Sequence, residues 1–291
     1  MIGTMKRAAA TLGAAAVLIF AAGTLPVLAG ETAPPARNDG FGATLWMQSS
    51  VEYKAAALGA YALARNRLDE ALSDPGWTAA TEQRGDYQTL PPAVIVDVDE
   101  TVLDNSAYMA RLVTKNEPFT MMSWDAFVKD EVSTPVPGAL AFAQYAASKG
   151  VKIFYVTNRP AGEKEATRGN LEKAGFPMGG NVETVLTQDP AQGWDEYKGK
   201  RRAFIAKDYR IVLLMGDNFG DFTDSFKGTP DARLKVFEAD KTRWGHDWIM
   251  LPNPTYGSWE QAPFEGDYKI PAARRRELQA EALKVWEPKA Q

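Results

Sequence analysis

Residues 93–105 read AVIVDVDETVLDN, and this stretch decides the fold class. A short run of apolar, largely β-branched residues ends abruptly at Asp97, and Asp99 follows two positions later. A strand that is apolar on both faces is typical of a parallel sheet covered by helices. Carboxylates at its carboxyl end would lie where open α/β sheets bind ligands. A period of two would let both acids face one pocket, where one could attack a substrate while the other handles protons.

The rest of the chain alternates between apolar strands and helices, as a parallel sheet with helical crossovers requires. We expect one helix or two in sequence over residues 43–72, and further helices over residues 138–149, 163–174, 196–207 and 272–286. We expect strands over residues 151–156, 182–186 and 211–215, with additional strands at 234–237 and 248–251. The sequence therefore predicts an α/β fold with a Rossmann-like parallel sheet wrapped by helices.

Polar residues follow three of the expected strands at the point where each strand ends. Taken alone, the first pair is equally consistent with two acids that end a strand and cap a helix. The carboxyl ends of parallel strands lie along one edge of a sheet, however, so three such endings can form a single site. The endings are Asp97 with Asp99, Thr157 with Asn158, and Asp217 with Asn218 and Asp221.

The composition excludes several kinds of chemistry. The chain has 291 residues, of which 45% are hydrophobic and 24% charged, as expected for one large core. A net charge of −4 argues against a nucleic-acid polymer as partner. There is no cysteine, so disulfides and thiol nucleophiles are excluded, and a single histidine, His246, argues against histidine nucleophiles and zinc hydrolases. Carboxylates must therefore carry the chemistry.

The N-terminus has the pattern of a secretory signal peptide. Lys6 and Arg7 precede an apolar run over residues 8–22, and residues 27–29 offer a cleavage site ending at Ala29. The run is short for a spanning helix, so the alternative of a retained anchor is less favoured. We expect residues 1–29 to be removed, leaving a periplasmic or secreted protein without a membrane span. Residues 30–291 would form a single domain, with a core over about 90–252.

These groups fit the hydrolysis of a phosphomonoester through an aspartyl-phosphate. Phosphoryl transfer depends mainly on positioning and charge neutralisation, and a carboxylate can act as the nucleophile. Because a carboxylate repels a phosphate dianion, a hard divalent cation such as Mg²⁺ is needed, and Asp97 and Asp217 are suited to hold it. Asp99 would protonate the leaving alcohol and then accept a proton from the attacking water.

Other groups would bind the phosphoryl oxygens. Thr157 and Asn158 can donate hydrogen bonds to them, and a lysine would offset their negative charge. Lys198, upstream of the strand that ends in Asp217, is the first candidate, and Lys200 competes with it. The alternative is that this basic segment is a solvated helix face.

The motifs resemble those of the haloacid dehalogenase superfamily, and within it those of the class C nonspecific acid phosphatases, which include lipoprotein 5′-nucleotidases. The finer similarity is the sequence Asp-Glu-Thr-x-Leu-Asp-Asn-x-x-Tyr, which residues 99–108 contain. Residues 46–53 and 251–260 resemble the N-terminal and C-terminal signatures of the class, so the resemblance spans roughly residues 44–262. The four superfamily motifs are residues 97–101, Thr157 in residues 156–159, Lys198, and residues 216–222.

The resemblance implies roles for individual residues. Asp97 would be the nucleophile and Asp99 the acid/base, and Mg²⁺ would bind the Asp97 and Asp217 carboxylates and the Asp99 main-chain carbonyl. Asp221 would lie close by. The resemblance also implies a smaller helical portion, over about 43–75 and 253–291, beside the core. The residues that would stack on a nucleobase or aryl ring are Trp124 and Tyr256, unless Trp124 serves hydrophobic packing.

The expected activity is therefore that of an exported Mg²⁺-dependent acid phosphatase acting on small phosphomonoesters, 5′-nucleotides and aryl phosphates among them. The lipoprotein members carry an acylated N-terminal cysteine, which this chain lacks. One alternative is a narrow-specificity phosphatase for a sugar phosphate or nicotinamide mononucleotide. Another is a catalytically weak surface-binding protein that kept the fold. The sequence leaves the oligomeric state open.

Overall fold

Strand β1 (Pro92–Val96) lies at the centre of a five-stranded sheet with the order β5-β4-β1-β6-β7. All four pairings are parallel. β4 (Lys152–Pro160) and β6 (Arg210–Gly216) flank β1, and β5 (Val185–Gln188) and β7 (Trp248–Met250) form the edges. The predicted α/β fold with a helix-covered parallel sheet is confirmed.

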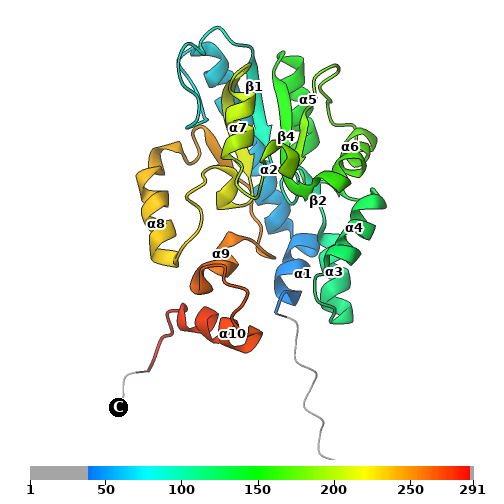
Figure 1. Cartoon of the computed structure of the whole chain (residues 1–291), viewed down its shortest axis with the longest axis vertical. Coiled ribbons are helices and arrows are strands. Elements are labelled where there is room, and N and C mark those ends of the chain that lie inside the picture. Colours follow the sequence, from blue (N-terminus) through cyan, green and yellow to red (C-terminus); the bar gives the residue numbers. More distant parts are fainter. Residues whose placement is uncertain (1–38, 289–291) are drawn as a thin grey trace, which may run out of the picture. The chain divides into compact units, whose positions relative to one another are not determined.

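The computed structural model describes residues 39–288 (Figure 1). The expected signal peptide over residues 1–29 lies outside the described residues. Among helices within residues 39–288, none combines the length and the apolar character that crossing a membrane requires.

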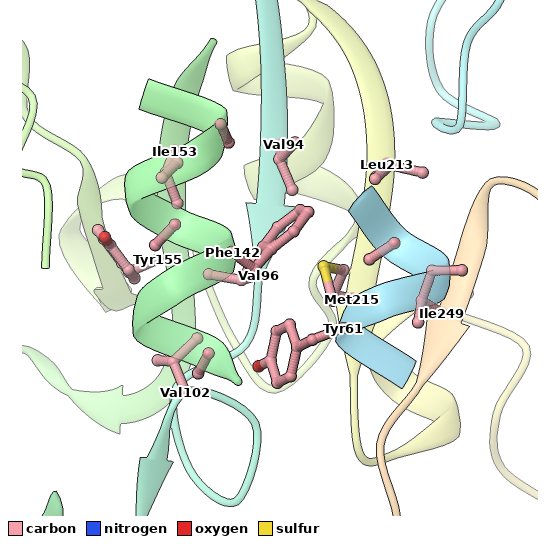
Figure 2. Packing of buried hydrophobic residues seen from close by; sticks show 14 of the residues in the cluster. Tyr61, Val94, Val96, Val102, Phe142, Ile153, Tyr155, Leu213, Met215 and Ile249 are labelled. Carbon is pink, nitrogen blue, oxygen red and sulfur yellow. The ribbon is translucent and has the colours of Figure 1, made fainter. Parts of the chain in front are cut away.

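The side chains of β1 alternate between two apolar layers, as the period of a strand requires. Val94 and Val96 belong to a cluster with residues of α2 (Val51–Ser73) and α5 (Ala139–Ser148), whereas Ala93 and Ile95 belong to a cluster on the opposite face. Figure 2 shows Val94 and Val96 beside Phe142 and Tyr61 in the first layer. Both faces of β1 are therefore buried, which explains its continuous apolar run.

Helices α2 and α5 cover one face of the sheet, and α7 (Gly199–Ile205) contributes Ile205 to the other. The helical stretch predicted over residues 43–72 is two helices, because Ser50 interrupts it and its hydroxyl accepts a hydrogen bond from the Tyr53 amide at 3.0 Å. The remaining elements are α1 (Phe41–Ser49), α3 (Ser106–Lys115), α4 (Met121–Lys129), α6 (Lys164–Lys173), α8 (Pro230–Ala239), α9 (Ser258–Gln261), α10 (Ala272–Glu281) and a small antiparallel sheet of β2 (Leu103–Asp104) and β3 (Thr134–Pro135).

The prediction of a strand at residues 234–237 is wrong, because these residues lie inside helix α8. The Thr229 hydroxyl accepts a hydrogen bond from the Ala232 amide at 3.2 Å, and Pro230 occupies the first helical turn. These signals start a helix whatever apolar residues follow. The predicted strand at residues 248–251 is confirmed as β7.

Several predicted boundaries also move, and two of these shifts bear on the residues at the sheet edge. β4 does not end at Val156 but continues to Pro160, so that Thr157 and Asn158 lie within the strand. The helix predicted over residues 196–207 begins only at Gly199, which leaves Lys198 just before its first turn. Both shifts affect where functional side chains lie.

Candidate active site

The polar residues singled out in the sequence come from the carboxyl-end half of three adjacent strands. Asp97 directly follows β1, Asp217 directly follows β6, and Thr157 lies in the last half of β4. Because β1 pairs in parallel with both neighbours, these positions lie along one edge of the sheet. In Figure 1 the helices α1, α3 and α9 lie beyond this edge.

Three carboxylates converge at this edge. Asp97, Asp217 and Asp221 each offer an oxygen, and these oxygens all lie within 4.8 Å of one another. The Thr101 hydroxyl lies 3.2 Å from Asp97 Oδ2 and 3.3 Å from Asp217 Oδ1. Asn253 Nδ2, in the side chain, donates to Asp217 Oδ2 at 2.7 Å. The cluster is thus held by short polar side chains from separate segments.

A glycine makes room for the third carboxylate. A Cβ at Gly216 would lie 2.1 Å from Asp221 Oδ2, so a side chain at residue 216 would displace Asp221. Asp221 Oδ2 also accepts a hydrogen bond from the Asn218 amide at 2.9 Å. The Gly-Asp-Asn sequence at the end of β6 therefore shapes the cluster through its backbone as well as its carboxylates.

The electrostatics of the cluster suit a cation. Burial raises the pKa of Asp97 to about 7 despite the opposing charge of Lys198, and Asp221 adds to the rise. Burial, followed by repulsion from Asp97 and Asp221, raises the pKa of Asp217 well above its ordinary value. Carboxylates that repel one another in a buried site are neutralised by a hard divalent cation with oxygen ligands. The donor set therefore fits a hard divalent cation.

The structure brings Lys198 into the site and leaves Lys200 outside it. Lys198 is 3% exposed, and its Nζ contacts Asp97 Oδ1 and lies 2.7 Å from Asp221 Oδ1. Burial lowers the pKa of Lys198, but the carboxylates of Asp221 and Asp97 outweigh burial, and the net shift is upward. Lys200 is exposed and donates to the Gly193 carbonyl at 3.0 Å. The alternative of a solvated helix face thus applies to Lys200, which is exposed, and not to Lys198, which is buried.

Asp99 lies in a separate group of contacts. Its Oδ1 accepts hydrogen bonds from Arg159 Nη2 at 2.7 Å and from Asn105 Nδ2 at 2.8 Å. Its Oδ2 accepts one from the Thr157 hydroxyl at 3.2 Å. Thr157 therefore meets Asp99 directly, as the shared sheet edge predicts.

Asn158 points elsewhere. Its side chain is exposed, donates to the Glu196 carbonyl at 3.1 Å and accepts from Arg201 Nη2 at 2.6 Å. Because Asn158 lies in β4, its side chain points away from those of Thr157 and Arg159 on either side of it. The structure thus unites Thr157 with Asp99 but places the Asn158 amide in other contacts.

The two predicted ring-binding residues each contact a buried acid. Trp124, in α4, donates from Nε1 to Glu163 Oε2 at 3.2 Å, and its ring lies edge-on to Tyr108 with centroids 5.2 Å apart. The Tyr256 hydroxyl donates to the carboxylate of Glu100, which is fully buried. Trp124 is half-buried, so its ring packs against Tyr108 while part of the side chain stays exposed.

Sequence reasoning missed Arg159, Glu100 and Asn105. A signal for Arg159 existed, because the residue two positions after Thr157 in a strand shares its face. Glu100 has a left-handed backbone with φ of 58°, and its carboxylate accepts from the Asn105 amide at 2.8 Å. Burial raises the pKa of Glu100 well above its ordinary value, with Asp99 adding to the effect. Burial of an acid within a motif loop has no local sequence signal.

Comparisons with known proteins agree with this geometry. A family profile described as HAD superfamily, subfamily IIIB (acid phosphatase) matches residues 4–259. Two structures of the class C acid phosphatase from Bacillus anthracis, one with tungstate bound, match with a TM-score of 0.75 at 33% and 32% identity, covering 85% of this chain and 98% of theirs. Acid phosphatase 1 of Solanum lycopersicum is 30% identical over 132 residues, which span 45% of this chain and 52% of the tomato protein. The chain therefore belongs to subfamily IIIB of the HAD superfamily, as an acid phosphatase of the class C type.

Proposed function

We propose that this class C-type acid phosphatase is an exported, Mg²⁺-dependent phosphomonoesterase that works through an aspartyl-phosphate on Asp97. The observation that carries the proposal is the contact between the Asp97 carboxylate and the buried Lys198 inside a cluster of three carboxylates. A nucleophilic carboxylate needs positive charge beside it to approach a phosphate dianion. Lys198 supplies one such charge.

In the first half-reaction an Asp97 oxygen forms a bond to phosphorus, and the bond from phosphorus to the leaving oxygen breaks. Asp99 gives its proton to that leaving oxygen. In the second half-reaction Asp99 takes a proton from water, the water oxygen bonds to phosphorus, and the bond to Asp97 breaks. Thr157 would donate to a phosphoryl oxygen, and Lys198 would offset the charge on the others.

Asp97 and Asp217 would hold Mg²⁺ together with the Asp99 main-chain carbonyl, and Asp221 would lie beside it. When bound, the cation supplies charge neutralisation between the nucleophile and the phosphate. Asp221 already pairs with Lys198 at 2.7 Å, which supports a role in orienting the lysine. The tungstate in a Bacillus anthracis relative supports an oxyanion site in this fold, since tungstate is a tetrahedral oxyanion like phosphate.

The leaving group would be an aryl ring or a nucleoside. Trp124 and Tyr256 would stack on its ring and provide affinity without strict base specificity. A narrow-specificity phosphatase for a sugar phosphate or nicotinamide mononucleotide would use the same Asp97 and Asp99 but make different contacts with the leaving group. We place the enzyme in the periplasm or outside the cell, because the N-terminal sequence has the signal-peptide pattern.

One assay tests the proposal. Phosphate release from aryl phosphates, 5′-mononucleotides and sugar phosphates is measured with Mg²⁺, and with a chelator. We expect activity that chelation abolishes and that Asp97→Asn removes almost entirely. Full activity of Asp97→Asn would overturn the covalent mechanism, and inactivity of the wild type on every ester would favour a surface-binding protein.

A further inference from the structure

A buried arginine, Arg159, holds the carboxylate of Asp99. Nη2 lies 2.7 Å from Asp99 Oδ1, and Nε lies 3.0 Å from the same oxygen. The Arg159 side chain is 1% exposed, whereas that of Asp99 is 18% exposed. The guanidinium is therefore the enclosed partner of this ion pair, and the carboxylate is the partner that a substrate can reach.

Further hydrogen bonds hold Arg159 in place. Nη1 donates to the Thr167 hydroxyl at 3.1 Å, and that hydroxyl donates to the Glu163 carbonyl at 2.8 Å. The Arg159 amide donates to the Thr157 hydroxyl oxygen at 3.1 Å. A planar guanidinium held on both sides has little freedom, and it presents its remaining donors in a fixed direction.

The same guanidinium lies against the predicted ring-binding residue. Arg159 Cζ is 5.4 Å from the centroid of the Trp124 ring, within the range of a cation–π contact. Arg159 thus touches both the proposed proton donor, Asp99, and a side chain proposed to bind the leaving group.

We propose that Arg159 is a positioning residue that holds the Asp99 carboxyl in the orientation from which it protonates the leaving oxygen. This inference rests on the proposed function, in which Asp99 is the acid/base. If Arg159 acts through Asp99, then its loss must slow the reaction in proportion to the need of the leaving group for a proton. Loss of fold stability alone would slow all substrates alike.

Two substrates separate these cases. 4-Nitrophenolate leaves as a stable anion and needs no proton, whereas the alkoxide of benzyl phosphate must be protonated as it leaves. Both carry an aromatic ring, and kcat/KM reports on the steps up to cleavage of the bond to the leaving group. We expect Arg159→Gln to lower kcat/KM for benzyl phosphate at least about tenfold more than for 4-nitrophenyl phosphate, since general acid catalysis contributes roughly 10²–10⁴-fold. Arg159→Lys keeps the positive charge but loses the planar guanidinium with its paired N–H donors. We expect it to show a smaller selective loss than Arg159→Gln.

Arg210 provides a matched control. Arg210 is also buried, and its Nη1 donates to the carbonyls of Ala71 and Asp74 at 3.0 and 2.7 Å. It is the first residue of β6 and therefore lies at the end of the sheet opposite the carboxylate cluster. Arg210→Lys should lower thermal stability without changing the ratio of the two kcat/KM values. Asp99→Asn should show the same selective loss as Arg159→Gln, and the double variant should lose no more selectivity, because the two residues act through one step.

The outcomes distinguish the inference from the proposed function. Equal losses on both substrates in Arg159→Gln, with a selective loss in Asp99→Asn, would overturn the positioning role and leave the proposed function intact. Equal losses in Asp99→Asn would overturn the acid/base role of Asp99 and the inference with it. If Arg159→Gln does not fold, as judged by circular dichroism, the same comparison is made with Arg159→Lys.

Discussion

The hydroxyl of Tyr256 donates a hydrogen bond to the buried carboxylate of Glu100, although the two residues are 156 positions apart in the chain. Glu100 lies in the loop that follows β1, between Asp99 and Thr101, and Tyr256 lies beyond β7. The carboxylate also accepts from the Asn105 amide, and Asn105 in turn donates to Asp99. The loop that would bind the leaving group is thereby tied to the loop that would move the proton.

Tyr256→Phe is expected to weaken this tie while keeping the ring. The change leaves a fully buried carboxyl without one of its donors, which costs roughly 1–3 kcal/mol in the free energy of unfolding. Thermal unfolding measures the loss. Tyr87→Phe is the control, because the Tyr87 hydroxyl donates to the Gly76 carbonyl at an exposed site. Equal melting temperatures for Tyr256→Phe and the wild type would show that the bond has no role in stability.

Lys198→Met is expected to reduce kcat/KM by about 100-fold or more, since it removes the cation beside the proposed nucleophile. It also leaves Asp97 and Asp221 without their shared partner in a buried setting, which destabilises by about 3–5 kcal/mol before any cation binds. Steady-state kinetics and thermal unfolding with and without Mg²⁺ measure both effects.

Lys200→Met is the matched control for Lys198→Met. Lys200 is exposed and contacts the Gly193 carbonyl, so its loss should change stability by less than about 0.5 kcal/mol and leave the kinetics near those of the wild type. A larger kinetic loss in Lys200→Met than in Lys198→Met would contradict the assignment of Lys198.

The sheet could be predicted from sequence because a parallel strand is buried on both faces. Its sequence is therefore one continuous apolar run, as in Val94–Val96. The ends of those runs located the site, and Asp97, Thr157 and Asp217 do lie at one sheet edge. Residues 234–237 show the limit of this reasoning. A short, largely apolar stretch fits a strand or a helix equally well, and the cap at Thr229 decides for the helix.

The contacts within the site were harder to predict. The strand was expected to end at Val156, with the side chains of Thr157 and Asn158 both at the site. The strand continues, and alternation turns the Asn158 side chain away from that of Thr157. Arg159 pairs with Asp99, 60 positions away, and Glu100 pairs with Tyr256, 156 positions away. Pairings over such separations depend on tertiary structure, which a single sequence does not reveal.

Trp124→Ala is expected to raise KM for 5′-nucleotides and aryl phosphates more than for small aliphatic phosphates. Stacking of a base on an aromatic side chain contributes about 1–3 kcal/mol, which corresponds to a KM increase of about 5-fold or more. Trp124→Phe keeps an aromatic face and serves as the control, with a smaller change. Equal losses on ring-bearing and aliphatic substrates in Trp124→Ala would remove Trp124 from the leaving-group site.

The metal-free protein is expected to become less stable as the pH rises toward 7. Burial raises the pKa of Asp97 from 3.8 to about 7, so the folded state holds a proton that the unfolded state has already lost. Stability from this group is therefore complete below about pH 4 and is lost as the pH rises through about 7. The change is on the order of 2–4 kcal/mol, or a fall in Tm of about 5 °C or more between pH 5 and 7.5.

Added Mg²⁺ should oppose this loss, and more strongly at pH 7.5 than at pH 5, because it binds the carboxylates only after their protons leave. Thermal unfolding across this pH range, with chelator and with Mg²⁺, measures both trends. Asp97→Asn removes one titrating group, and the metal-free variant should show a shallower dependence of Tm on pH than the wild type. If Asp97→Asn keeps the full slope, the raised pKa of Asp97 is not its source. If Mg²⁺ stabilises equally at both pH values, Asp97 and Asp217 do not exchange protons for the cation.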